Sequence, residues 1–317
     1  MTSPRLPLRG IVPPTVTPLD RSHRLDKGSF TRVLEHLLDG GVHGIFVLGS
    51  TSEVVFHDAD VRREIVEHAV RIVNGRVPVL VGAVDPTTQR VIEHARAAKD
   101  AGADGIVVTA PFYARTSQAE IADHFRFIRD AVDIPLIAYD IPVCVHVKLE
   151  RATVATLMRE GVIAGLKDSS GDEGNFRYAL MDAAERPDFF AMTGAELTAD
   201  CALLMGAHGI VPGLANVDPH AYVRLYEAAG RGDWAAARAE QEHLCRLFEI
   251  VRVGLPRTSV GAAGVGGFKT AMMLLGIVDD NVMALPQRTL EGSEIDRVSE
   301  ILKSVGLLER APARAAV

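Results

Sequence analysis

The chain contains few cysteines and no long apolar run. Its three cysteines, Cys144, Cys201 and Cys245, are too few and too scattered for a disulfide framework, which favours a reducing compartment. No stretch approaches the roughly eighteen uninterrupted apolar residues of a membrane-spanning helix. The first ten residues hold two arginines but not the apolar segment of a signal peptide. These absences predict a cytoplasmic protein that does not act at a membrane.

Several cofactor and partner signatures are also missing. A net charge of −7 gives no electrostatic reason to expect a nucleic acid or an anionic lipid surface as a partner. Neither a dinucleotide-binding Gly-x-Gly-x-x-Gly motif nor a Walker A motif is present. The eleven histidines include no pair at helical ligand spacing beside a carboxylate, and Cys144 and His146 lack a second pair of ligands. We expect neither a cofactor nor a metal.

The chain does contain a short sequence pattern that recurs four times. Each copy has the end of a helix, a glycine able to take the left-handed cap, and then an apolar run that begins at a further glycine. The glycines that open the four runs are Gly44, Gly105, Gly165 and Gly209. Each of these runs is predicted to be a β-strand.

Four other apolar runs alternate with the glycine-led ones, at 11–16, 77–82, 134–139 and 187–193. The eight predicted strands have an average spacing of roughly 30 residues, which leaves room for one helix after each strand. Residues 58–73, for example, place apolar side chains at helical spacing. Short apolar strands that alternate with helices indicate a parallel sheet buried on both faces. Eight units favour a closed (β/α)8 barrel, although an open doubly wound sheet would give a similar pattern.

The pattern changes after Gly213, where helical segments continue without further strands. They are predicted at 218–230, 233–252, 266–276 and 291–307, with the glycine-rich residues 261–267 as a flexible link before a helix. Residues 311–317 are expected to form a frayed tail. The predicted organisation is a barrel of residues 1–232 and a small C-terminal helical extension of residues 233–317 that packs on the barrel.

In a barrel of this kind the reactive residues lie at the carboxyl ends of the strands and in the loops that follow. Lys167 directly continues an apolar strand, a position where lysine is rare. Burial disfavours the charged form of an amine, and a neutral amine can attack a ketone carbonyl. The residues equally allow a lysine that pairs with Asp168 or extends to solvent.

Two further strand ends carry hydroxyl groups. Tyr139 ends an apolar strand, where its hydroxyl could relay protons at the barrel mouth or its ring could simply fill the mouth. Residues 49–53, Gly-Ser-Thr-Ser-Glu, offer small hydroxyls and backbone N–H groups that suit a carboxylate. Turns rich in serine and threonine also commonly cap a following helix.

These residues together resemble the pyruvate-dependent Schiff-base superfamily of dihydrodipicolinate synthase, N-acetylneuraminate lyase and 2-keto-3-deoxygluconate aldolase. The resemblance extends over residues 9 to about 307 and rests on the order and spacing of five motifs. They are Gly49–Glu53, Pro111–Tyr113, Tyr139–Pro142, Gly165–Asp172 and Thr193–Gly194.

The resemblance implies a role for individual residues. Lys167 would form the imine with pyruvate or another 2-oxo acid, and Tyr139 would shuttle protons. Ser50 and Thr51 would bind the substrate carboxylate, with Thr51 also bridging to Tyr139. Tyr113 would reach into the site of a neighbouring subunit of a homotetramer built as a dimer of dimers. Gly194 and Val211 would line the pocket through their main chains.

Three positions depart from the family pattern. Ser52 stands where the turn usually has glycine, and Asp140 where asparagine is usual. Cys144 occupies the position at which dihydrodipicolinate synthases carry an arginine that holds the carboxylate of the semialdehyde. A thiol offers neither the charge nor the forked donors of a guanidinium. Cys144 therefore predicts a more permissive pocket, suited to a neutral aldehyde that is sugar-derived or aromatic.

The leading hypothesis is thus a class I lyase or aldolase that makes or breaks a carbon–carbon bond between a 2-oxo acid and an aldehyde. The alternatives are dihydrodipicolinate synthase itself, a dehydratase of a 2-oxo-3-deoxy sugar acid, and a catalytically silent barrel that binds a 2-oxo acid.

Overall fold

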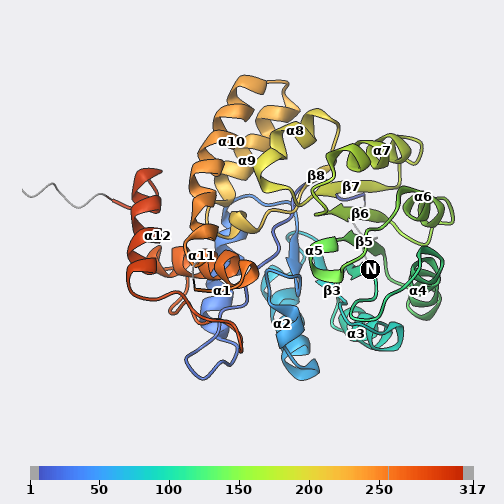
Figure 1. Ribbon diagram of the computed structural model, residues 1–317, viewed down its shortest axis with the longest axis horizontal. Helices are drawn as coiled ribbons and strands as arrows, with labels where there is room; N and C mark the ends of the chain where they lie inside the picture. Colours follow the sequence, from blue (N-terminus) through green and yellow to red (C-terminus); the bar gives the residue numbers. More distant parts are fainter. Residues whose placement is uncertain (1–6, 256, 310–317) are drawn as a thin grey trace, which may run out of the picture.

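The computed structural model describes residues 7–255 and 257–309, in which eight parallel strands form the centre of the molecule (Figure 1). The strands follow the order β1-β8-β7-β6-β5-β4-β3-β2, so that β2 to β8 pair in sequence and β1 pairs with β8. Their bounds are β1 Gly10–Ile11, β2 Ile45–Val47, β3 Val79–Gly82, β4 Gly105–Thr109, β5 Leu136–Asp140, β6 Gly165–Asp168, β7 Phe190–Thr193 and β8 Gly209–Ile210.

Backbone hydrogen bonds between the segments of β1 and β2 close the sheet into a barrel. His43 N–H donates to Ile11 O at 2.8 Å, and Thr15 N–H donates to Phe46 O at 2.8 Å. The first strand is shorter than the predicted 11–16, because Pro13 and Pro14 have no N–H to donate. The predicted (β/α)8 barrel is therefore confirmed.

The helices that follow the strands begin at capping side chains and surround the barrel. Asp58, for example, accepts a hydrogen bond from the Val61 N–H and starts a helix of the predicted length. Each copy of the recurring pattern has one glycine with the positive φ expected of a left-handed cap: Gly41 (+79°), Gly102 (+93°), Gly161 (+70°) and Gly206 (+99°). The bounds are α1 Lys27–Asp39, α2 Ala59–Val73, α3 Thr88–Asp100, α4 Gln118–Ala131, α6 Arg151–Arg159, α7 Glu173–Ala184, α8 Ala199–Leu204 and α9 Pro219–Gly230.

Short helical segments occupy several loops at the carboxyl ends of the strands. They are η1 Val54–Phe56, α5 Pro142–Val145, η2 Glu196–Thr198 and η3 Gly213–Asn216. Each of them holds the loop after a strand in a compact form, which places the side chains of that loop near the barrel mouth.

The remaining elements are α10 Trp234–Phe248, η4 Glu249–Arg252, α11 Val260–Leu274 and α12 Ser293–Ser304. In Figure 1 they lie to the left of most of the strands, with α12 farthest out. The prediction that residues 261–267 form a flexible link is wrong, since they make up the first half of α11. Ser259 caps this helix, and a side chain on Gly267 would come within 2.5 Å of Ile250 O. Close packing on η4 thus outweighs the low helix propensity of glycine.

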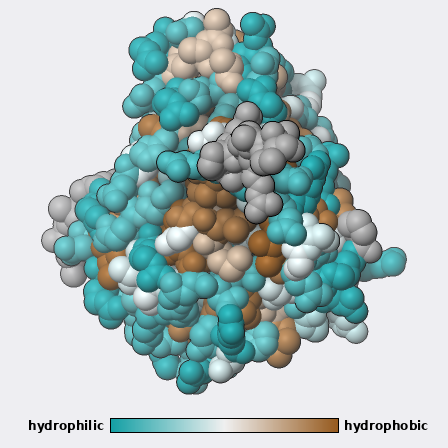
Figure 2. All heavy atoms as spheres, turned by 90° about the vertical axis from the view of Figure 1, so that its left-hand side faces the viewer, coloured by the Kyte–Doolittle hydropathy of each residue, from teal (hydrophilic) through white to brown (hydrophobic). Residues whose placement is uncertain are grey.

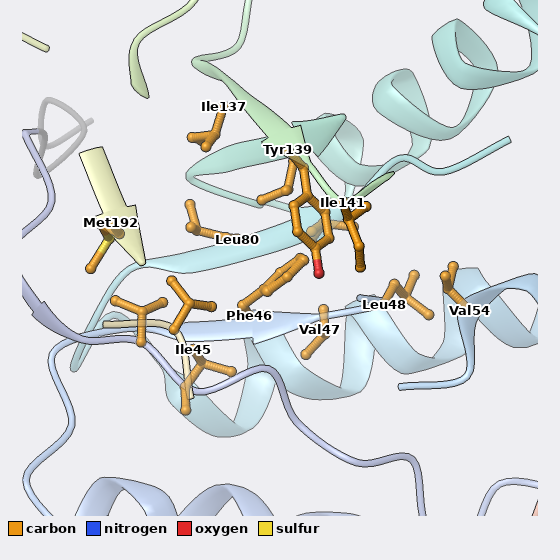
Figure 3. Close-up of a cluster of buried hydrophobic side chains, with 14 of the residues drawn as sticks. Ile45, Phe46, Val47, Leu48, Val54, Leu80, Ile137, Tyr139, Ile141 and Met192 are labelled. Carbon is orange, nitrogen blue, oxygen red and sulfur yellow. The ribbon is translucent and has the colours of Figure 1, made fainter. Parts of the chain in front are cut away.

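Side chains from neighbouring strands fill the barrel. Phe46 of β2, Leu80 of β3, Ile137 and Tyr139 of β5 and Met192 of β7 converge in its interior (Figure 3). No helix among residues 7–255 and 257–309 has the length and apolar character needed to span a membrane. The predicted tail at 311–317 lies outside the described residues.

Candidate active site

Lys167 is the most unusual side chain at the strand ends. It lies near the end of β6 and is only 5% exposed. Its Nζ donates a hydrogen bond to Ser169 Oγ at 3.0 Å and lies 3.4 Å from the centroid of the Tyr139 ring. The Asp168 carboxylate forms its ion pair with Lys148, whose Nζ lies 3.7 Å away, whereas the hydrogen bond of Lys167 goes to Ser169. The amine is therefore enclosed and held against an aromatic face.

Tyr139 is the direct neighbour of Lys167 across the sheet. The two residues are register partners on β5 and β6. The Tyr139 ring packs edge-to-face on Phe46 at 6.5 Å between centroids (Figure 3). Its hydroxyl lies 3.4 Å from Ser50 Oγ, whereas the family resemblance implies Thr51 as the bridging residue. Tyr139 thus connects the amine of Lys167 to the hydroxyl-bearing turn after β2.

That turn has a tightly determined backbone. Leu48 and Glu53, at its two ends, have φ values of +58° and +57°, which are unfavourable for residues with side chains. Gly82 of β3 allows this path, because a Cβ at that position would lie 1.9 Å from Leu48 O. Ser52 is fully buried, and its Oγ donates to Thr15 O at 2.6 Å. The serine that replaces the usual glycine is therefore accommodated by a hydrogen bond.

An ion pair from the C-terminal helices fixes the end of the same turn. Lys269 of α11 is fully buried and donates a hydrogen bond to Glu53 Oε2 and another to Val282 O at 2.8 Å. Glu53 Oε1 accepts a hydrogen bond from Ala284 N–H at 2.7 Å. Sequence reasoning did not identify Lys269, because a lysine in a glycine-rich segment carries no sign of a partner 216 residues away.

A cavity of about 890 Å³ opens beside this turn. Its walls come from the loops after β2 and β5 and from η4 and α11, and they include Ser50, Thr51, Tyr139 and Cys144. Figure 2 looks at the molecule from the left of Figure 1, where α11 and α12 lie, and shows hydrophobic residues in a hollow at the middle of that face. A space of this size holds far more than a three-carbon acid.

Cys144 lies in the cavity wall, on the short helix α5. Cys144 is exposed to solvent at the cavity, and the protein atoms around it raise the pKa of its thiol, although the nearby charge of Lys167 acts in the opposite direction. The segment that carries Cys144 is anchored behind it, where Lys148 Nζ donates to Asp140 Oδ2 and, at 3.0 Å, to Ser170 Oγ. Asp140 is buried and its pKa is raised by burial, so the cation of Lys148 supports its charged form. An acidic residue in place of the usual asparagine is thus matched by a lysine.

The structure places the remaining predicted residues around this centre. Gly194 packs on Ser169, the hydrogen-bond partner of Lys167, since a Cβ there would lie 2.1 Å from Ser169 Oγ. The N–H groups of Gly194 and Val211 are both used in backbone bonds, to Asp168 O and to Thr193 O. Tyr113 points away from the chain at 98% exposure and has a φ of +71°. A pocket-lining role for Gly194 and Val211, and a role of Tyr113 in a neighbouring subunit, stay predictions.

Glu196 is a cavity residue that sequence reasoning missed. It lies just after β7, and its Oε1 accepts hydrogen bonds from Leu214 N–H at 2.7 Å and from Tyr222 O–H at 3.3 Å. Burial raises the pKa of its carboxyl to about 7. The rule that reactive residues follow barrel strands covers this position, but the rule gives no reason to choose Glu196 over other loop residues.

Among the described residues, no three His, Cys, Asp or Glu side chains gather in a way that could hold a metal ion. The groups that converge at the barrel mouth are instead an amine, a phenol and small hydroxyls. This set is suited to nucleophilic capture of a carbonyl followed by proton transfer.

The comparisons of this chain with known proteins agree on one family. The sequence profile of the dihydrodipicolinate synthetase family matches residues 7–305. A DapA-like lyase of Halobacterium salinarum is 35% identical over 284 residues, which cover 88% of this chain and 92% of the relative. A 4-hydroxy-tetrahydrodipicolinate synthase of Phenylobacterium zucineum is 34% identical over 243 residues, which cover 77% of this chain and 82% of that protein.

Solved structures show the same likeness. Dihydrodipicolinate synthase from Bacteroides thetaiotaomicron superimposes with a TM-score of 0.89 at 34% identity, over 94% of this chain and 99% of the other. YagE, a prophage protein of Escherichia coli K12 crystallised in complex with pyruvate, superimposes with a TM-score of 0.88 at 29% identity, over 95% and 99% of the two chains.

Proposed function

The chain belongs to the dihydrodipicolinate synthetase family of class I aldolases and lyases, and we propose that Lys167 is its Schiff-base residue, with pyruvate as the preferred 2-oxo acid. The observation that carries the assignment is the buried amine of Lys167, 3.4 Å from the ring centroid of Tyr139. Pyruvate is the ligand of the related protein YagE, which supports it as the donor.

The geometry supports the following sequence of steps. The amine of Lys167 adds to the ketone of the 2-oxo acid, and loss of one water gives the imine. Ser50 and Thr51 hold the carboxylate of the acid through their hydroxyls and the backbone of the turn. Tyr139 carries protons between these groups, since its hydroxyl lies 3.4 Å from Ser50 Oγ and its ring faces the amine. Removal of a proton from the adjacent carbon gives an enamine that attacks an aldehyde, and the reverse sequence cleaves the bond.

We propose a neutral aldehyde as the second substrate. Cys144 lies in the cavity wall at the position where a dihydrodipicolinate synthase would carry an arginine. Its thiol cannot hold a carboxylate with the two parallel hydrogen bonds of a guanidinium.

We also propose a cytoplasmic homotetramer built as a dimer of dimers, in which Tyr113 reaches into the neighbouring subunit. Its 98% exposure and positive φ support this proposal, because an aromatic ring in a strained loop gains little from facing water. All three cysteines are free, which agrees with a reducing compartment. Sedimentation of the wild type and of Tyr113→Ala tests the assembly.

The test of the imine is reduction with borohydride in the presence of pyruvate, followed by intact mass measurement and peptide mapping. A reduced pyruvyl adduct on Lys167 is expected. The adduct should disappear in Lys167→Ala and in Lys167→Arg and persist in Lys99→Ala, which removes an exposed lysine at the end of α3. An adduct on another lysine, or full turnover by Lys167→Ala, would overturn the proposal.

A second candidate is dihydrodipicolinate synthase itself. It is favoured by relatives that carry the name 4-hydroxy-tetrahydrodipicolinate synthase at 34% identity. It predicts efficient condensation of pyruvate with aspartate semialdehyde. A kcat/KM for aspartate semialdehyde above that for every neutral aldehyde would select this candidate.

A further inference from the structure

The cavity wall is rich in aromatic rings. Four of the eleven phenylalanines of the chain, Phe56, Phe112, Phe248 and Phe268, line it. They come from η1, from the loop after β4, and from α10 and α11, so they surround the cavity from several sides. Aromatic rings pack favourably against one another in offset or edge-to-face arrangements.

The charged groups of the wall are engaged or lie at its edge. Glu53 is paired with Lys269, and the Glu196 carboxylate accepts two hydrogen bonds from protein groups. The Arg252 side chain is 61% exposed and lies 3.8 Å from Glu249. An aldehyde with many hydroxyls or a charge would exchange its hydrogen bonds with water for contacts with apolar side chains, which is unfavourable.

Two glycines of α11 leave space on the same wall. Gly261 and Gly264 are one helical turn apart and both line the cavity. A Cβ on Gly264 would meet no atom within 4 Å, and one on Gly261 only the end of the Gln287 side chain at 3.9 Å. One turn further along the helix, by contrast, a Cβ on Gly267 would lie 2.5 Å from Ile250 O. Close packing therefore accounts for Gly267 but not for the two cavity glycines.

We infer that the aldehyde of this enzyme is aromatic and that Gly261 and Gly264 open the space for its ring, an inference that rests on the proposed function. In the synthetic direction, a carbon–carbon bond forms between the former methyl carbon of pyruvate and the aldehyde carbon. The carbonyl π bond of the aldehyde breaks, and its oxygen takes a proton. The water released on imine formation is returned when the iminium is hydrolysed, which frees Lys167 and a 4-aryl-4-hydroxy-2-oxobutanoate.

The experiment compares aldehydes of different character at saturating pyruvate. Benzaldehyde and 2-naphthaldehyde represent aromatic acceptors, and glyceraldehyde and aspartate semialdehyde represent polar ones. We expect kcat/KM for the aromatic aldehydes to exceed that for the polar ones by about tenfold or more. Gly264→Leu should lower kcat/KM for 2-naphthaldehyde by a similar factor and for benzaldehyde by less, because the new side chain fills the space.

Gly230→Leu is the matched control. Gly230 is also a helical glycine with no atom within 4 Å of an added Cβ, but it lies at the exposed end of α9, outside the cavity wall. A preference of the wild type for glyceraldehyde or aspartate semialdehyde would overturn the inference, as would equal effects of the two leucine variants. Borohydride trapping with pyruvate distinguishes a failure of the proposed function from a failure of the aromatic-acceptor inference. Loss of trapping on Lys167 in the wild type contradicts the proposed function, whereas normal trapping with a polar preference contradicts only the aromatic acceptor.

Discussion

Lys269 and Glu53, 216 positions apart, form a fully buried ion pair that ties helix α11 to the turn carrying Ser50 and Thr51. Each partner makes one further bond to backbone, Lys269 to Val282 O and Glu53 to Ala284 N–H. The C-terminal helices thereby help to determine the backbone of the turn 49–53, and the barrel and the extension line one cavity together.

Breaking this ion pair is expected to affect both stability and binding. Lys269→Met leaves the Glu53 carboxylate buried without its cation, which should lower the free energy of unfolding by about 3–5 kcal/mol. Because the turn loses an anchor, the KM for pyruvate should rise more than kcat falls. Urea denaturation and steady-state kinetics measure the two effects. The double variant Glu53→Gln/Lys269→Met should recover part of the stability, and a double variant less stable than Lys269→Met would contradict the role of the pair.

The ion pair of Asp140 and Lys148 should respond in the same way to the loss of its cation. Lys148→Met removes the cation that supports the buried Asp140 carboxylate, and we expect a loss of about 3 kcal/mol. Asp140→Asn introduced together with Lys148→Met restores the neutral amide usual in the family and should recover most of that loss. Chemical denaturation of the wild type, the single variant and the double variant is the measurement, and equal stability of the wild type and Lys148→Met would refute the prediction.

Cys144→Arg is expected to change the aldehyde preference. A guanidinium in the cavity wall supplies a charged hydrogen-bond donor for a carboxylate, which should raise kcat/KM for aspartate semialdehyde relative to a neutral aldehyde by roughly tenfold. Cys144→Ala serves as the control, since it removes the thiol without adding charge. An unchanged ratio in Cys144→Arg would show that this position does not select the second substrate.

Glu196 should make the stability of the protein depend on pH. Burial raises the pKa of its carboxyl to about 7 from an ordinary value of 4.5, so the folded state binds the proton more tightly than the unfolded state. Its contribution to stability is fully present below about pH 4.5 and is lost as the pH rises to about 7, on the order of 1–3 kcal/mol in total. Denaturation of the wild type and Glu196→Gln at pH 5 and pH 8 tests this. The wild type should lose more stability than the variant between the two pH values, and parallel losses would contradict the assignment.

The eight strands, the helices between them and the position of Lys167 at a strand end could all be predicted from the sequence. Alternating apolar runs and left-handed glycine caps are local patterns, and the rule that barrel sites gather at the carboxyl ends of strands converts them into a short set of candidates. The family motifs then distinguish Lys167, Tyr139 and the turn 49–53 among these candidates.

Other features depended on contacts between distant segments, which no local pattern records. Residues 261–267 are poor helix formers by propensity, yet packing of Gly267 on Ile250 makes them a helix. The partners of Glu53 and Asp140, the bond from Ser50 to Tyr139 and the enclosure of Glu196 arise in the same way. The sequence by itself determined the barrel and the place of Lys167 at the end of a strand, because periodicity and turn chemistry act over a few residues. Only the tertiary structure decided the shape and charge of the cavity, because burial and pairing depend on elements that the chain brings together from far apart.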